Sequence, residues 1–260
     1  MKKLILTVAM LLFTGATFAQ FQFSVHLGGS LPTGDFGKTQ ISNEDIYSSV
    51  LFNDYGEQGN AGPGFNLGVK GKGSLPVEGL GLIATVDGFY NSLNKEMKDL
   101  RDRSLNSVYD GGDYRDVAME IKLPRYINIP VMLGLNYQMD FSDAFGIWVE
   151  AAAGLNVRII TDFGTENFEW EGDLWYHIKN EVDYKTSVCF AYQMGLGAMF
   201  ANRISLGIHY YNLGNKSLTR TESQTSIDDY GGESLFIFPT NDGYQKLKSS
   251  MFVLRLGYHF

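Results

Sequence analysis

The sequence predicts an all-β fold, an eight-stranded, antiparallel, up-and-down β-barrel that crosses a membrane. Three observations predict it. Apolar and polar residues alternate along many segments, the connections between these segments are short and long in turn, and no apolar run after residue 19 approaches the roughly 20 residues of a spanning helix. A chain that enters a membrane without helices has to close its strands into a barrel, because every backbone N–H and C=O group must be paired inside lipid.

The clearest strand is the last one. Five residues share one face of it, and the partner face carries two basic residues and a glycine. The apolar face holds Phe252, Leu254, Leu256, Tyr258 and Phe260, which alternate with Val253, Arg255, Gly257 and His259. The same alternation marks residues 21–28, 65–70, 82–90, 127–138, 145–159, 188–200, 204–210 and 252–260. We therefore expect eight strands.

The connections between these strands fall into two classes. Residues 71–79, 139–144 and 201–203 are short turns, whereas residues 31–62, 92–121, 160–186 and 214–249 are long loops. Short turns on one rim and long loops on the other are typical of outer-membrane barrels. Ten strands remain an alternative if residues 235–239 belong to an extra membrane hairpin, but we expect this segment to extend a strand above the membrane.

The N-terminus predicts export. Lys2 and Lys3 precede an apolar run from Leu4 to Phe13, and Thr17-Phe18-Ala19 has the small-x-small pattern of a cleavage site. We expect a signal peptide over residues 1–19 and one barrel domain over residues 20–260.

Composition agrees with a barrel wall and excludes several kinds of site. The 30 Gly, 15 Tyr and 18 Phe suit strands with aromatic girdles. The single cysteine, Cys189, excludes an internal disulfide and the usual cysteine zinc sites. The formal net charge of −8 argues against nucleic acid as a partner. We find no metal motif, phosphate-binding loop or nucleophile elbow, so we expect no cofactor, no metal and no enzymatic activity.

Three segments carry a resemblance to a known family. Residues 31–36 (LPTGDF), residues 126–130 (YINIP) and residues 256–260 (LGYHF) resemble the outer membrane protein β-barrel domain, or porin-like, family of Gram-negative bacteria. The resemblance covers residues 20–260 and implies insertion into the cell outer membrane, without implying a substrate. Phe260, with Tyr258 two residues earlier, resembles the signal that the barrel-assembly machinery reads.

The polar faces of the strands predict a charged interior. On a lipid-facing position a charge costs roughly 2–4 kcal/mol at the midplane, so charged wall residues should face the lumen. An eight-stranded barrel leaves room only for side chains or one small ligand, so charges there must pair. We predict a network of Glu150 and Arg255, with His26, Asp87 and His209 in nearby layers. A salt-bridged plug is the favoured interpretation, and a gated ion path or catalysis are the alternatives.

The long loops carry most of the 29 Asp and Glu residues. They could form a binding surface for an extracellular partner, bridge to lipopolysaccharide through divalent cations, or simply be solvated. We therefore expect an outer-membrane protein with a structural or surface-interaction role, in contact with outer membrane lipids and lipopolysaccharide. A narrow porin or small-ligand path is the alternative. A lipid-modifying enzyme would need a Ser and His pair on the lipid face, which the sequence does not offer.

Overall fold

The structure, a computed structural model, describes residues 21–39, 59–106, 108–110, 114–171, 174–228, 230–237 and 241–260. The predicted signal peptide lies outside these residues. In the described part of the chain one antiparallel sheet contains thirteen strands, with a 3₁₀ turn and a helix beside it. The elements are β1 (Phe21–Thr33), η1 (Gly34–Phe36), β2 (Ala61–Ser74), β3 (Leu80–Leu93), α3 (Lys95–Leu105), β4 (Val108–Asp110), β5 (Tyr114–Lys122), β6 (Arg125–Ser142), β7 (Phe145–Ile160), β8 (Phe163–Glu171), β9 (Leu174–Tyr184), β10 (Ser187–Phe200), β11 (Ile204–Asp228), β12 (Glu233–Ile237) and β13 (Asn241–His259).

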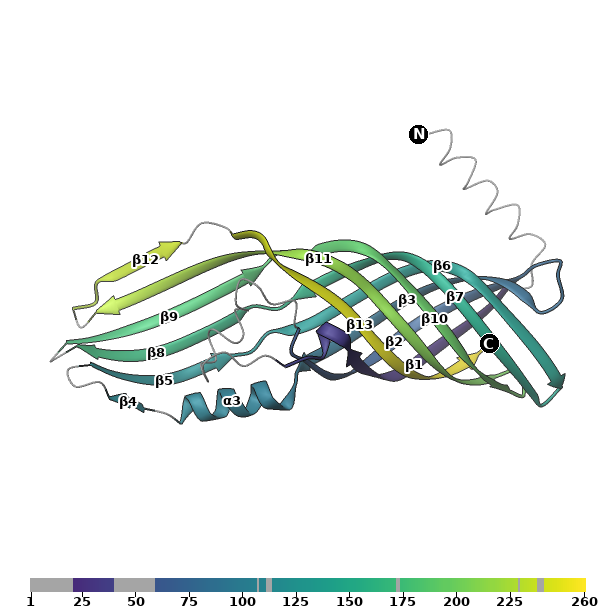
Figure 1. The fold of residues 1–260 in the computed structure, drawn as a ribbon, viewed down its shortest axis with the longest axis horizontal. Coiled ribbons are helices and arrows are strands. Elements are labelled where there is room, and N and C mark those ends of the chain that lie inside the picture. Colours follow the sequence, from purple (N-terminus) through teal and green to yellow (C-terminus); the bar gives the residue numbers. More distant parts are fainter. Residues whose placement is uncertain are drawn as a thin grey trace, which may run out of the picture.

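The sheet closes on itself. Strand pairing runs from β1 through β2, β3, β6, β7, β10, β11 and β13, and β13 pairs with β1 again. We call these strands the ring (Figure 1). Closure leaves no free strand edge within the ring, so its backbone donors and acceptors are satisfied by neighbouring strands.

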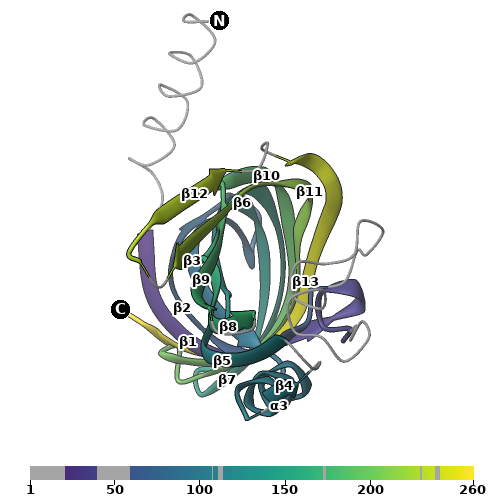
Figure 2. The ribbon, with the colours of Figure 1, turned by 90° about the vertical axis from the view of Figure 1, so that its left-hand side faces the viewer.

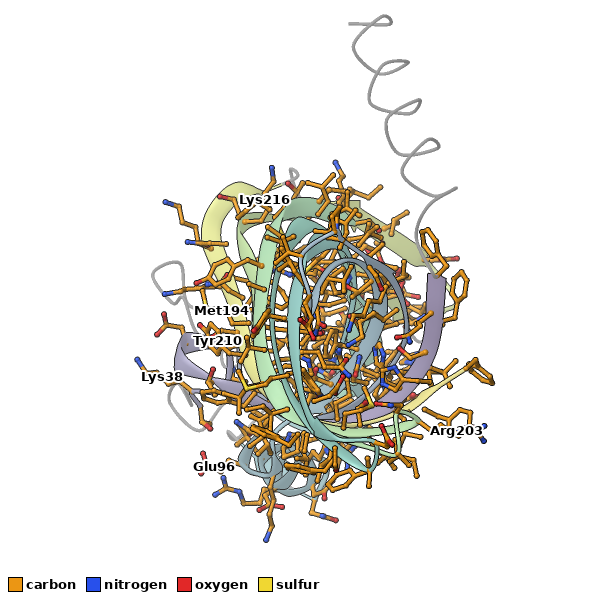
Figure 3. All side chains as sticks on the ribbon, turned by 90° about the vertical axis from the view of Figure 1, so that its right-hand side faces the viewer. Lys38, Glu96, Met194, Arg203, Tyr210 and Lys216 are labelled. Carbon is orange, nitrogen blue, oxygen red and sulfur yellow. The ribbon has the colours of Figure 1, made fainter. Side chains whose placement is uncertain are left out.

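The two faces of the ring differ in chemistry, as the alternation predicted. On β10, Leu196 is 63% exposed on the outer face, whereas Gln193 is 1% exposed on the inner face. Register keeps this division from strand to strand, because Leu27 pairs with Leu67 on β2 and with Leu256 on β13. Apolar side chains therefore cover the outside of the ring, and polar side chains are buried within it. Figure 3 shows the interior filled with side chains, with Met194 and Tyr210 on the outside of the wall.

One end of the ring continues as a further sheet, which we call the extension. β11 runs for 25 residues, and its last part pairs with β9 on one side and with β12 on the other. β8, β5 and β4 then follow β9 in order. The turns at residues 75–79, 143–144 and 201–203 lie at the opposite end of the molecule (Figure 1).

The extension corrects two expectations. The sequence predicted eight strands, or ten as an alternative. The described sheet has thirteen, of which eight form the ring and five belong to the extension. The segments expected to be long loops are largely strands: β5 in residues 92–121, β8 and β9 in residues 160–186, and β11 with β12 in residues 214–249. Pairing of these segments satisfies the hydrogen bonds of backbone N–H and C=O groups, which in a loop would have to bind water. β12 lies outside the ring, beside β11.

Helix α3 was also expected to be part of a loop. Its N-terminus is capped by the Asn94 side chain, which accepts a hydrogen bond of 3.0 Å from the Met97 N–H. Met97 and Leu100 are buried, and the helix contacts β5 on the outside of the ring (Figure 2). None of the helices in the described segments is long and apolar enough to span a bilayer.

We predict that glycines facing the ring interior are required for packing. A Cβ atom added to Gly207 would overlap the indole of Trp148, whereas one added to the outward Gly29 would meet no atom within 4 Å. Gly207→Ala should therefore lower the free energy of unfolding by about 1–3 kcal/mol, and Gly29→Ala should not. Urea unfolding of the refolded protein measures both, and equal stabilities for the two variants would contradict the assignment.

Candidate functional site

The candidate site is a cluster of charged side chains in the middle of the ring, which we call the lumenal cluster. The structure places all five residues singled out by the sequence on the inner face, and none is more than 5% exposed. They are His26 on β1, Asp87 on β3, Glu150 on β7, His209 on β11 and Arg255 on β13. Alternation within each strand directs them inward, and closure of the ring brings five strands to one point.

Asp87 is the centre of one half of the cluster. Its Oδ1 accepts hydrogen bonds from Arg255 Nη2 at 2.9 Å and Asn66 Nδ2 at 3.2 Å, and lies 2.5 Å from His26 Nε2. The Tyr211 hydroxyl donates to Oδ2 at 3.1 Å and also contacts Arg255. A carboxylate in this position is fully desolvated, and these four partners replace its lost hydration.

Glu150 is the centre of the other half. Lys70 Nζ donates to Oε2 at 2.9 Å, and His209 Nε2 lies 3.0 Å from Oε1. Asn136 Nδ2 adds a longer contact of 3.4 Å to Oε2. The sequence predicted that Glu150 would pair with Arg255, but Arg255 pairs with Asp87 and the cation on Glu150 is Lys70. The stagger of neighbouring strands sets which inward residues meet across the lumen, and residue spacing alone does not reveal it.

Sequence reasoning left three members out of the predicted cluster. Lys70 has the correct strand parity, and Tyr211 lies two residues after His209 on the same inward face. The Trp148 ring lies 5.3 Å from the imidazole of His209 and 5.2 Å from Lys70 Nζ, measured to ring centroids. The same alternation places all three on the inner face, although it does not show which residues they meet there.

Two inward glycines make room for the cluster. A Cβ atom on Gly68 would overlap both Asp87 Oδ1 and His26 Nε2, and one on Gly195 would overlap the His209 ring. The absence of a side chain at Gly68 therefore lets Asp87 and His26 contact each other on the inner face of the ring.

Packing closes the lumen on both sides of the cluster. Toward the extension lie Phe89, Tyr211 and Val253, each at most 1% exposed, with the rings of Phe89 and Tyr211 4.8 Å apart. Toward the short turns lies a cavity of about 10 Å³, beside Trp148 and Lys70. A cavity of this size holds about one water molecule. The described side chains therefore pack closely on both sides of the cluster.

The structure also shows where the remaining candidate groups lie. His259 Nε2 and Ser205 Oγ lie 2.9 Å apart on inward faces near the short-turn end, and not on the outer face. Cys189 is buried, and its thiol donates to the Leu213 carbonyl. Among the described residues, no group of three or more His, Cys, Asp or Glu side chains is placed to hold a metal ion.

The two residues of the predicted assembly signal lie on the outside of the ring. Tyr258 and Phe260 are exposed, and their rings meet edge to face with centroids 5.1 Å apart. The Phe260 N–H donates to the carbonyl of Phe23 on β1 at 2.8 Å. Their recognition by the barrel-assembly machinery stays a prediction.

We predict that Asp87 and Arg255 are energetically coupled. Arg255→Met or Asp87→Asn alone leaves a buried charge without its partner and should cost about 3–5 kcal/mol of unfolding free energy. The double variant removes both charges and should recover at least half of the summed loss. Urea unfolding measures the cycle, with Lys72→Met as control, because Lys72 Nζ donates to the neutral Gln138 side chain at 2.8 Å. Additive losses in the double variant would exclude the coupling.

Comparisons with known proteins place the chain near solved outer membrane proteins. No protein-family model and no curated protein matches the sequence. The structure is similar to a major outer membrane protein from Thermus thermophilus (12% identity, 92% of this chain and 99% of that chain covered, TM-score 0.40). It is also similar to Neisserial surface protein A (10% identity, 92% and 95% covered, TM-score 0.37) and to OprG from Pseudomonas aeruginosa (12% identity, 92% and 95% covered, TM-score 0.39). At these TM-scores, the case for a membrane barrel rests on this chain's own residues.

Proposed function

We propose that the chain is an integral outer-membrane barrel whose eight ring strands anchor it and whose extension acts at the cell surface. One observation carries the proposal: a closed ring of strands is apolar on the outside and charged and packed on the inside. A water-soluble barrel would have the opposite arrangement, because exposed apolar surface is unfavourable in water.

The outer face supports a membrane position for the ring. Large apolar side chains on several ring strands are more than half exposed. Such exposure is unfavourable in water and becomes favourable when the side chains contact lipid hydrocarbon. They include Leu67, Leu133, Leu155, Phe190, Leu196 and Leu254. The charged wall residues Lys70, Asp87, Glu150, Arg158 and Arg255 are all buried inside.

Aromatic contacts mark the two ends of this apolar belt. Near the short turns Phe145 packs against Phe141 and Phe200, with ring centroids 6.0 and 5.7 Å apart. Near the extension Phe65 stacks on Tyr90, with centroids 5.2 Å apart, and Tyr210 packs against Phe252 at 5.4 Å. Two such aromatic girdles are typical of membrane barrels, because these rings favour the lipid headgroup region.

The extension supports a surface-interaction role. The carboxylates of Glu181 and Asp183 lie exposed on β9, near Asp162, and burial together with Asp162 and Glu181 raises the pKa of the Asp183 carboxyl. The carboxylates of Asp162, Glu181 and Asp183 thus lie together on this part of the extension. Such a surface could contact an extracellular partner, or lipopolysaccharide through divalent cations.

An exposed edge of the extension supports the same role. In the described segments β12 pairs only with β11, and its Leu235, Phe236 and Ile237 are each more than half exposed. An apolar, unpaired strand edge is a surface that other chains can contact. We propose no enzymatic activity, no cofactor and no nucleic-acid partner for this chain.

We predict that the extension faces the cell exterior. Tyr230, which is 87% exposed in the extension, and Asp143, exposed in a short turn, lie at opposite ends of the molecule. In a Cys189→Ala background, Tyr230→Cys should react with a membrane-impermeant maleimide on intact cells, and Asp143→Cys only after permeabilisation of the outer membrane. The reverse order of labelling, or no labelling of Tyr230→Cys, would contradict the proposal.

We predict that the wild-type protein does not conduct ions, because packed side chains fill its lumen. Planar-bilayer recordings of the refolded chain should show no defined steps. A variant with Trp148→Ser and Tyr211→Ser removes two large lumenal rings and should conduct, which makes it the positive control. Defined channels in the wild type would favour the narrow-porin alternative instead.

A further inference from the structure

A pocket of about 690 Å³ lies between α3, the end of β5 and the ends of β3 and β6 that face the extension. Four cationic side chains line it, Lys98, Arg101, Lys122 and Arg125, with Asp162 as the one carboxylate among its lining residues. The whole chain carries a net charge of −8, so this concentration of positive charge stands out against its surroundings. The pocket is separate from the lumenal cluster, because α3 lies outside the ring (Figure 2).

The pocket begins where the apolar belt ends. Tyr90 lines it and also stacks on Phe65 in the girdle near the extension. The guanidinium carbon of Arg125 lies 5.9 Å from the centroid of the Tyr90 ring, a cation–π contact. Positive charge therefore lies directly above an aromatic residue of the girdle, at the level where the ring surface changes from apolar to polar.

The four cations are only weakly engaged with the protein. Lys98 Nζ donates to the neutral Ser92 Oγ at 3.0 Å, and Lys122 Nζ lies 3.9 Å from Asp162 Oδ2. Arg101 pairs with its neighbour Asp102 at 2.7 Å, and this pair is partly exposed, so solvent weakens it. An incoming anion could replace these contacts at little cost.

We propose that this pocket binds the phosphorylated headgroup of an outer-leaflet lipid. The guanidinium groups of Arg101 and Arg125 match the oxygens of a phosphate, and Lys98 and Lys122 add charge. The acyl chains would run along the apolar ring surface past Tyr90 and Phe65. Basic pockets at a membrane boundary recognise anionic headgroups in this way. This inference rests on the proposed function, since it needs the ring in the membrane with the extension outside.

The test uses the full chain in nonionic detergent micelles, with dioleoylphosphatidic acid as the probe and native mass spectrometry as the readout. The test variant is Lys98→Gln/Arg125→Gln. The control is Lys216→Gln/Lys248→Gln, which removes two exposed cations from the neighbouring strands β11 and β13, where Lys248 pairs with Asn215, the residue before Lys216. Figure 3 labels Lys216. We expect the test variant to bind the lipid at least tenfold more weakly and the control to stay within twofold of wild type.

Three outcomes would overturn the inference: equal losses in the two variants, unchanged binding in the test variant, or inorganic phosphate displacing the lipid at equal concentration. Equal losses would indicate that cations anywhere on the surface attract the anionic lipid. Displacement by inorganic phosphate would indicate a site for the free anion and not for a lipid headgroup. If Lys98→Gln/Arg125→Gln does not fold, Arg101→Gln/Lys122→Gln repeats the test. Flotation of the wild type with phosphatidylcholine vesicles tests the proposed function separately from the lipid site. A protein that does not insert into these vesicles would contradict the membrane-anchoring function, whatever the result for the pocket.

Discussion

Charged side chains sealed within a ring of strands must be paired there, and this constraint organises the molecule. Asp87 and Glu150 are buried where water cannot hydrate them, so each takes a cation and further donors from other strands. These contacts join β1, β2, β3, β6, β7, β11 and β13 across the lumen. The outer face of the middle of the ring is then left to apolar side chains.

The same packing separates the two functional regions. Phe89, Tyr211 and Val253 are packed in the lumen on the extension side of the cluster, which supports the proposal that the ring anchors the chain. Under this proposal, contacts with other molecules fall to the parts beyond the belt, the extension and the basic pocket beside α3. The acidic carboxylates of β9 and the cations around Arg125 give these parts opposite charge, which suits two different kinds of contact.

Strand parity could be predicted from the sequence, and contacts across the lumen could not. Alternation alone placed Asp87, Glu150 and Arg255 on the inner face, because a period of two fixes the side of every residue in a strand. Which cation meets which carboxylate depends on the stagger of the strands around the ring, and so Arg255 was assigned to Glu150. Lys70 had the correct parity, but nothing in its spacing indicated that it would reach Glu150 on a strand 80 residues away.

The strands of the extension are a second feature that could not be predicted from the sequence. Acidic residues on β8 and β9 interrupt the apolar alternation expected of a membrane strand, so these segments resemble loops when they are judged as membrane strands. Helix α3 did leave a signal, since Asn94 is a preferred N-cap residue and Met97 and Leu100 have helical spacing. Its position beside the ring still depends on the burial of Met97 and Leu100 in a hydrophobic cluster with Ile121 and Leu93, which lie in two different strands.

The most direct test of opposite solvents on the two faces of the ring is a spin-label accessibility scan along β13 in lipid vesicles. Labels would be placed one at a time at Met251, Phe252, Val253, Leu254 and Leu256, in a Cys189→Ala background. We expect collisions with oxygen to peak at positions 252, 254 and 256, with a water-soluble nickel chelate excluded there, and positions 251 and 253 to be shielded from both reagents. Oxygen collisions without a period of two, or nickel access at positions 252, 254 and 256, would contradict a membrane-spanning ring.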